Sequence, residues 1–263
     1  MASNHWRKYF GIESYKYDWY FKRFFYKYLG IKLPKLKDQH QYWEDRGQVY
    51  MNEILRSGYL EYERFFQDLL VKELTELQFE SAFEAGCGFG WNVKRVKEEF
   101  PEVRVGGLDF SSTQLKNSEL YLKGMNAEIR QGDICKMPFD NGHFDVGFSL
   151  GVFMNIHAGR IRKALLELTR VSKKFVIHLE YDESNTTNDL RERRAFKTNI
   201  VSHDYKSLYE SLGFKVKKFC TFKDFGEQYR IHAERTSKNV ERWEGLEGPG
   251  KYIMIVVEVN QRF

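Results

Sequence analysis

Short apolar runs alternate with amphipathic segments along the chain from residue 79 onward. Apolar runs of roughly four to eight residues between turn residues are typical of buried strands, and apolar positions three and four apart are typical of helices. This alternation predicts βαβ units and a mainly parallel sheet, that is, an α/β fold. The predicted strands are 81–85, 103–108, 127–131, 144–149, 174–180, 214–219 and 252–259, and the predicted helices between them are 92–99, 113–123, 160–171 and 205–212.

Two further helices are predicted before this region, at 41–57 and 60–77. We therefore divide the chain into an N-terminal helical cap, residues 1–78, and an α/β domain, residues 79–263. The last two strands have no crossover helix between them and are predicted to form a hairpin. The polar segment at about 222–250 is predicted to be an insertion, and loops of this length in a compact domain are usually functional or mobile.

Residues 5–37 differ from the rest in composition, with nine basic residues and two acidic ones. Five aromatic residues in this segment follow helical spacing: Tyr17, Tyr20, Phe21, Phe24 and Tyr28. Three interpretations remain open. The helix could cap the site, it could form a lid that contacts a phosphorylated or nucleotide-linked acceptor, or it could lie on an anionic membrane surface.

Composition limits the class of protein. The hydrophobic fraction of 42% suits a globular protein, and the net charge of +5 does not by itself imply nucleic acid. The three cysteines lack the spacing of metal ligands, and no apolar run approaches the roughly 18 residues that span a bilayer. The first residues lack the apolar centre of a secretion signal. We expect a cytoplasmic protein with no metal site.

The stretch FEAGCGFGWN, residues 83–92, carries the main candidate chemistry. An apolar strand leads into Gly86, Gly88 and Gly90, and a helix opens after them. Glycines at such a turn let the backbone adopt unusual dihedral angles and approach a ligand closely, and the helix N-terminus offers unpaired N–H groups to a polar group. Asp109 ends the second strand, 19 residues after Gly90, where a carboxylate can accept both hydroxyls of a ribose.

Two more strand ends point to the same site. Asp133 and Ile134 follow the third strand, where they could bond and pack against an adenine, and Ser149 ends the fourth strand. Each residue also has a purely structural interpretation, since Asp109 could sit at a helix N-terminus and Asp133 could form a turn. It is the ordered set that predicts a nucleoside ligand.

With these motifs the sequence resembles the class I methyltransferases that depend on S-adenosylmethionine (SAM). The matching elements are Glu84 with the three glycines, Asp109, the GDI of 132–134 and the FDVGFSLGV of 144–152, within about 79–259. The resemblance implies a Rossmann-like, seven-stranded, mostly parallel sheet with an antiparallel last strand. It implies that the glycine turn holds the methionine end of SAM, Asp109 the ribose, and Asp133 with Ile134 the adenine, on which Phe110 stacks.

The stretches SLGVFMNI and ELTRVSKKFVIHLEYDE are further similar to small-molecule methyltransferases of sugar and surface-glycan biosynthesis, including those linked to pseudaminic acid. We therefore expect methylation of a small molecule or glycan, with oxygen favoured as the acceptor atom and nitrogen as the alternative. An oxygen acceptor needs a base, and the candidates at strand ends are Asn155, His157, Glu180 and Tyr181, with Asp182 and His203 further out. Many relatives place a histidine where this chain has Asn155, which leaves the base open.

Two other functions fit parts of the sequence. One is a module that binds nucleic acid or a membrane without catalysis, through residues 5–37. The other is a nicotinamide enzyme, for which the third glycine of G-x-G-x-x-G would come one residue too early, at Gly90.

Overall fold

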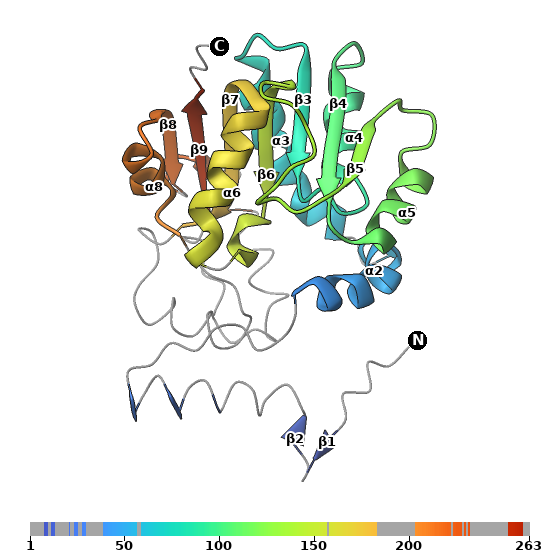
Figure 1. The fold of residues 1–263 in the computed structure, drawn as a ribbon. Coiled ribbons are helices and arrows are strands. Elements are labelled where there is room, and N and C mark those ends of the chain that lie inside the picture. The colour runs from blue at the N-terminus through green and yellow to red at the C-terminus, as the bar shows by residue number, and fades with distance from the viewer. Residues whose placement is uncertain are drawn as a thin grey trace.

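The computed structural model describes residues 8–9, 12–13, 21, 24–25, 28–29, 39–56, 59–156, 158–182, 203–221, 223–227, 229, 231 and 252–259. Its main feature is a seven-stranded sheet in the order β5-β4-β3-β6-β7-β9-β8 (Figure 1). The strands are β3 (Ser81–Ala85), β4 (Arg104–Asp109), β5 (Glu128–Gln131), β6 (Phe144–Leu150), β7 (Ser172–Tyr181), β8 (Lys215–Thr221) and β9 (Tyr252–Glu258).

Strands β3 to β7 run parallel to one another, whereas β9 runs antiparallel to both β7 and β8. The parallel strands end at the lower edge of the sheet in Figure 1, and β9 points the opposite way. The α/β fold class and the antiparallel last strand are thereby confirmed. The predicted hairpin of the last two strands is present, and β9 inserts between β7 and β8.

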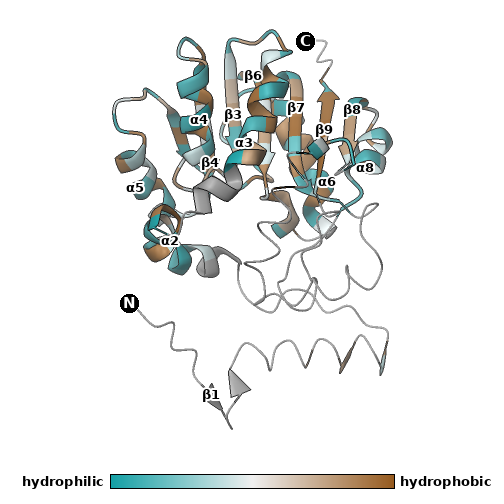
Figure 2. Ribbon diagram, turned by 180° about the vertical axis from the view of Figure 1, so that it is seen from behind, coloured by the Kyte–Doolittle hydropathy of each residue, from teal (hydrophilic) through white to brown (hydrophobic). Residues whose placement is uncertain are grey.

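Helices cover both faces of the sheet and close two hydrophobic cores. On one face, α6 (Ala158–Val171) and α8 (Tyr205–Ser211) pack on side chains such as Phe83 and Val176. On the other, α3 (Tyr59–Thr75) and α4 (Trp91–Glu99) pack on Ala82 and Ile177. Figure 2 shows α3 and α4 in front of the apolar strands. Helix α3 thus shares a hydrophobic core with the α/β region, so the chain is packed continuously across residue 78. The division into two domains at this residue stays a prediction.

Helix α2 (Gln39–Arg56) lies at the edge where the parallel strands end, against α5 (Ser112–Tyr121) (Figure 1). Glu44 of α2 accepts hydrogen bonds from the Ser112 hydroxyl at 2.6 Å and from the N–H and hydroxyl of Thr113 at 3.1 and 2.7 Å. These bonds lower the pKa of Glu44 to about 2, the Ser112 hydroxyl contributing most. Since the first N–H groups of a helix lack partners inside it, Glu44 caps α5 from a different helix.

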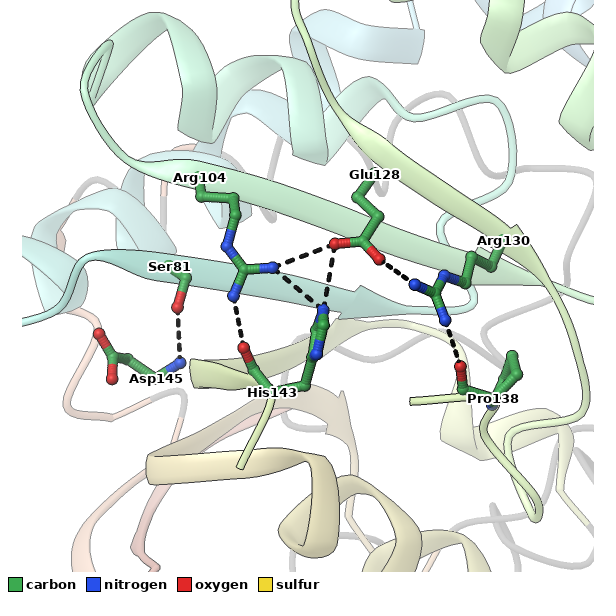
Figure 3. A network of polar contacts seen from close by, with 7 residues as sticks. All are labelled: Ser81, Arg104, Glu128, Arg130, Pro138, His143 and Asp145. Carbon is green, nitrogen blue, oxygen red and sulfur yellow. Dashed lines mark hydrogen bonds and ion pairs between the residues drawn. The ribbon is translucent and has the colours of Figure 1, made fainter. Parts of the chain in front are cut away.

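The opposite edge of the sheet is tied together by a polar network (Figure 3). Glu128 at the start of β5 pairs with Arg104 of β4, Arg130 and His143, and the Ser81 hydroxyl accepts the N–H of Asp145 at 2.9 Å. Surface ion pairs contribute only about 0–1 kcal/mol each. We therefore assign this network to strand register.

The remaining predictions differ from the structure mainly at element ends. Strand β7 begins two residues earlier than predicted, and β8 covers Lys215–Thr221 rather than 214–219. The two-residue strands β1 (Lys8–Tyr9) and β2 (Ile12–Glu13) were not predicted. Of the segment 222–250, most lies outside the described residues. No helix in the described part of the chain is long and apolar enough to cross a membrane.

Candidate functional site

The turn after β3 explains its three glycines. Gly86, Gly88 and Gly90 have φ angles of +80°, +54° and +90°, in the left-handed region that side chains disfavour. A Cβ at Gly86 would lie 2.3 Å from Val152 Cγ1, and one at Gly90 would lie 2.6 Å from a methyl carbon of Leu122. At Gly88 the nearest atom would be 3.9 Å away. The turn is therefore packed against the protein at both ends and has room beside its middle residue.

Asp109 lies directly against this turn. Its Oδ2 accepts the N–H of Gly88 and its Oδ1 the N–H of Ser111, both at 2.9 Å. The Ser111 hydroxyl in turn accepts the N–H of Gln114 and caps α5. Burial raises the pKa of Asp109. The structure thus brings Asp109 and Gly88 together at one edge of the sheet, as the spacing in the sequence predicted.

Glu84 is buried in the strand below the turn. Its Oε1 accepts a hydrogen bond from Asn92 Nδ2 at 2.7 Å, and the Oδ1 of Asn92 accepts one from Gln67 of α3 at 2.8 Å. Burial raises the pKa of Glu84 to about 8. Its second oxygen, Oε2, is buried without a hydrogen-bond partner among the described residues. Such an oxygen is costly in an interior, and it suits a neighbouring cationic group.

Asp133 and Ile134 follow β5 at the same edge. Asp133 bonds the N–H of Cys135 at 2.9 Å and pairs with Arg160 of α6. Partial burial opposes ionisation of Asp133, but these two partners outweigh it, and its pKa lies below the usual range. Ile134 is buried in the core. Phe110 is half-buried, and its carbonyl accepts the side-chain N–H of Gln131 at 3.0 Å.

Ser149 and Glu180 lie inside the protein rather than at a surface. The Ser149 hydroxyl donates to Glu180 Oε1 and contacts His178 Nδ1, each at 2.7 Å. Glu180 also accepts the N–H groups of Val152, Phe153 and Met154 around the short helix η1 (Phe153–Asn155). Both side chains are completely buried. Contact of Ser149 with a ligand and a base role for Glu180 therefore stay predictions, and the hydrogen bonds that the structure gives both side chains are to other residues of the protein.

The other predicted base candidates are spread around η1. Asn155 ends η1 and is half-buried, whereas Tyr181 is buried with its hydroxyl 3.4 Å from that of Tyr252. Asp182 and His203 are both buried, and His203 Nε2 lies 3.0 Å from the carbonyl oxygen of Ile156. His157 lies outside the described residues. In the described part of the chain, no group of three or more His, Cys, Asp or Glu is placed to hold a metal ion.

Three residues of this region were not found from the sequence. Val152 packs on Gly86, and Glu44 caps α5 from a helix 68 residues away in the chain. Neither contact has a local signal. His178 did have one, since His178 and Glu180 are polar residues two apart in an apolar strand, which places them on one face of the sheet.

Comparisons with known proteins agree with this geometry. Residues 82–174 match a family described as "Methyltransferase domain". Over 118 residues the chain is 34% identical to a demethylmenaquinone methyltransferase of Staphylococcus carnosus, covering 43% of this chain and 47% of that protein. Over 109 residues it is 29% identical to a botryococcene C-methyltransferase of Botryococcus braunii, covering 40% and 28%. The match thus spans less than half the length of these curated relatives.

The fold is also that of solved methyltransferases. A geranyl diphosphate C-methyltransferase from Streptomyces coelicolor superposes with a TM-score of 0.60 over 73% of this chain and 79% of its own, at 15% identity. The family match over residues 82–174 and the superposition show that this part of the chain is similar to a methyltransferase domain and has the methyltransferase fold. No link to glycan or pseudaminic acid biosynthesis is found among these relatives.

Proposed function

We propose that this protein transfers the methyl group of SAM to a small molecule. The observation that carries the proposal is the left-handed glycine turn with Asp109 bonded to Gly88 and the unpartnered oxygen of Glu84 beneath it. Bound there, SAM would supply a methyl group already activated by its sulfonium. The protein then mainly has to align the acceptor and exclude water.

The proposed cofactor residues fall into three groups. The backbone from Gly86 to Gly90 holds the methionine end, with Glu84 Oε2 near its ammonium group, and Asp109 holds the ribose. Phe110, Ile134 and Asp133 frame the adenine. Asp133 has less support than the others, because its carboxylate already bonds Arg160 and the N–H of Cys135.

The acceptor remains open between two chemistries. Oxygen on a sugar or other polar molecule is the acceptor that we predict from the sequence. An apolar isoprenoid is the alternative that the named substrates of the relatives suggest. Incubation with methyl-labelled SAM and separate polar and lipid extracts of the source cells would distinguish them, since label would enter only one extract. A cytoplasmic location and the division at residue 78 also stay predictions.

Cofactor binding is the direct test of this function. We expect S-adenosylhomocysteine to bind in isothermal titration, and Asp109→Ala to weaken it by about 1–3 kcal/mol, the scale of hydrogen bonds to a charged group. Asp140→Ala, at an exposed position, is the control and should bind like the wild type. No binding by the wild type at millimolar ligand would exclude the proposal. Tight binding of NADH instead would favour the nicotinamide enzyme.

We further propose that residues 5–37 contact an anionic membrane surface. The described aromatic positions are helical and largely exposed, with 49% of Phe21, 53% of Phe24 and 65% of Tyr28 accessible. The rings of Phe24 and Tyr28 lie 5.1 Å apart, and those of Phe21 and Phe25 lie 4.7 Å apart, so these aromatic side chains contact one another in pairs. Nine basic residues in the same segment complement anionic lipid. Aromatic and basic residues on one helix are the usual features of interfacial helices.

Vesicle sedimentation tests this contact. We expect the protein to pellet with phosphatidylglycerol-containing vesicles and not with neutral ones, and added salt to weaken the association. The double variant Phe21→Ser, Phe24→Ser should lose at least about tenfold in binding, since each ring contributes a few kcal/mol of burial. Leu120→Ser is the matched control, because Leu120 is 70% exposed on α5. Equal binding by both variants would contradict this role.

A further inference from the structure

Glu180 is the centre of a buried network of hydrogen bonds that has no part in the proposed chemistry. Its Oε1 accepts the Ser149 hydroxyl at 2.7 Å and the N–H groups of Val152 and Phe153 at 2.9 and 3.0 Å. Its Oε2 accepts the N–H of Met154 at 3.3 Å. One carboxylate thus holds three consecutive N–H groups, which are the first groups of η1 and lack partners within it.

Each hydrogen bond in this buried network donates its hydrogen in the direction of Glu180. Ser149 gives its single hydroxyl hydrogen to Glu180, so His178 Nδ1 must carry a hydrogen and donate it to Ser149 Oγ. Burial lowers the pKa of His178 to about 3, which keeps its ring neutral with only one N–H. His178 Nε2 is then an acceptor, and the Tyr209 hydroxyl donates to it across 2.6 Å. This arrangement stabilises a negative charge on Glu180.

The segment that Glu180 holds also contacts the glycine turn. Val152, whose N–H bonds Glu180, packs its side chain over Gly86 so closely that a Cβ there would lie 2.3 Å from it. Gly151 precedes it with a φ of +62° and donates its N–H to the carbonyl of Leu179 at 2.9 Å. The position of residues 151–155 is therefore fixed from β7 on one side and by the cofactor turn on the other.

From these contacts we propose that Glu180 is a positioning residue, which sets residues 151–155 against the Gly86 turn through Val152. This positioning role adds a residue to the proposed function and rests on that function. Glu180 touches neither cofactor nor acceptor in this role, and accepts no proton from the acceptor. A displaced Val152 would move the turn that holds the methionine end, so loss of Glu180 should first appear in cofactor affinity.

The charge on Glu180 gives a second readout. Burial raises its pKa to about 7, so it changes charge in the accessible pH range. The titratable groups that face it are His178 on β7, Glu84 on β3, and Tyr205 and Tyr209 on α8, while Asp182, directly after β7, faces Tyr205. Burial raises the pKa of both tyrosines and lowers that of His178, so these three stay neutral near pH 7. A protonated carboxyl resembles an amide, and Glu180→Gln imitates that state.

The experiment compares S-adenosylhomocysteine affinity in the wild type and Glu180→Gln between pH 6 and 8.5. We expect the variant to bind about 5- to 20-fold more weakly at pH 8, because its NH₂ group faces the N–H of Met154 in place of an acceptor. At pH 6 the two should differ by less than about threefold, since the wild-type carboxyl is then itself protonated. Ser149→Ala should weaken binding in the same direction, by about two- to fivefold.

Three outcomes are separable. Glu119→Gln, on the exposed face of α5, should match the wild type at every pH. If the wild type binds and Glu180→Gln binds equally well at pH 8, the positioning role is excluded while the methyltransferase proposal stands. A wild type that binds nothing removes the proposed function instead. Should Glu180→Ala fail to fold, the glutamine variant still decides, because it conserves volume.

Discussion

Replacing Gly86 by alanine is expected to destabilise the protein by about 2–5 kcal/mol and to abolish measurable cofactor binding. Two effects add. A side chain at a φ of +80° costs about 1–2 kcal/mol, and overpacking against Val152, 2.3 Å away, costs about 1–3 kcal/mol. Urea unfolding gives the loss of stability, and titration with S-adenosylhomocysteine gives the loss of affinity.

The chain offers a control that separates the two effects. Gly124 has a φ of +86° with no atom within 4 Å of its added Cβ, so Gly124→Ala carries the backbone strain alone. It should cost about 1–2 kcal/mol and leave binding unchanged. Val152→Ala in the Gly86→Ala background removes the methyl groups that clash and should restore about 1–2 kcal/mol. If Gly86→Ala and Gly124→Ala are equally stable, the packing of Val152 on the turn is not as described.

Features that depend on a short stretch of the chain could be predicted from the sequence. The three glycines could be predicted because each needs its own left-handed φ, and a turn between a strand and a helix is visible in a short stretch. Asp109 could be predicted because parallel strands end at one edge, so a residue at the end of β4 must lie beside the end of β3. Fold class followed from the same periodicity.

The parts that were missed depend on contacts between distant segments. Arg160 pairs with Asp133 across 27 residues, and Glu44 reaches α5 across 68, and neither pairing leaves a pattern in the chain. Glu180 lies near the end of β7, and its inward direction was not predicted from the sequence. It was expected to face an acceptor, and it faces inward because the three N–H groups of residues 152–154 and the Ser149 hydroxyl need an acceptor there.

The buried carboxyl of Glu84 should make the stability of the protein fall as pH rises. Its pKa is about 8 in the folded protein, raised mainly by burial and further by the charge of Asp109, and is 4.5 in the absence of these effects. Between these values the unfolded chain releases the proton that the folded chain retains, so the unfolded state gains stability with rising pH. The free energy of unfolding should therefore be highest below pH 4.5 as far as this group is concerned, and should decrease until about pH 8.

Glu84→Gln should flatten this dependence. The amide oxygen can still accept from Asn92, and the side chain no longer ionises. At about 1.4 kcal/mol per pKa unit, we expect the wild type to lose about 2–4 kcal/mol between pH 5 and 8.5 that the variant retains, measured by urea unfolding at several pH values. A smaller slope should persist in the variant up to about pH 7, because burial also raises the pKa of Glu180. Glu119→Gln should follow the wild type. Parallel curves for Glu84→Gln and wild type would mean that folding does not raise the pKa of Glu84.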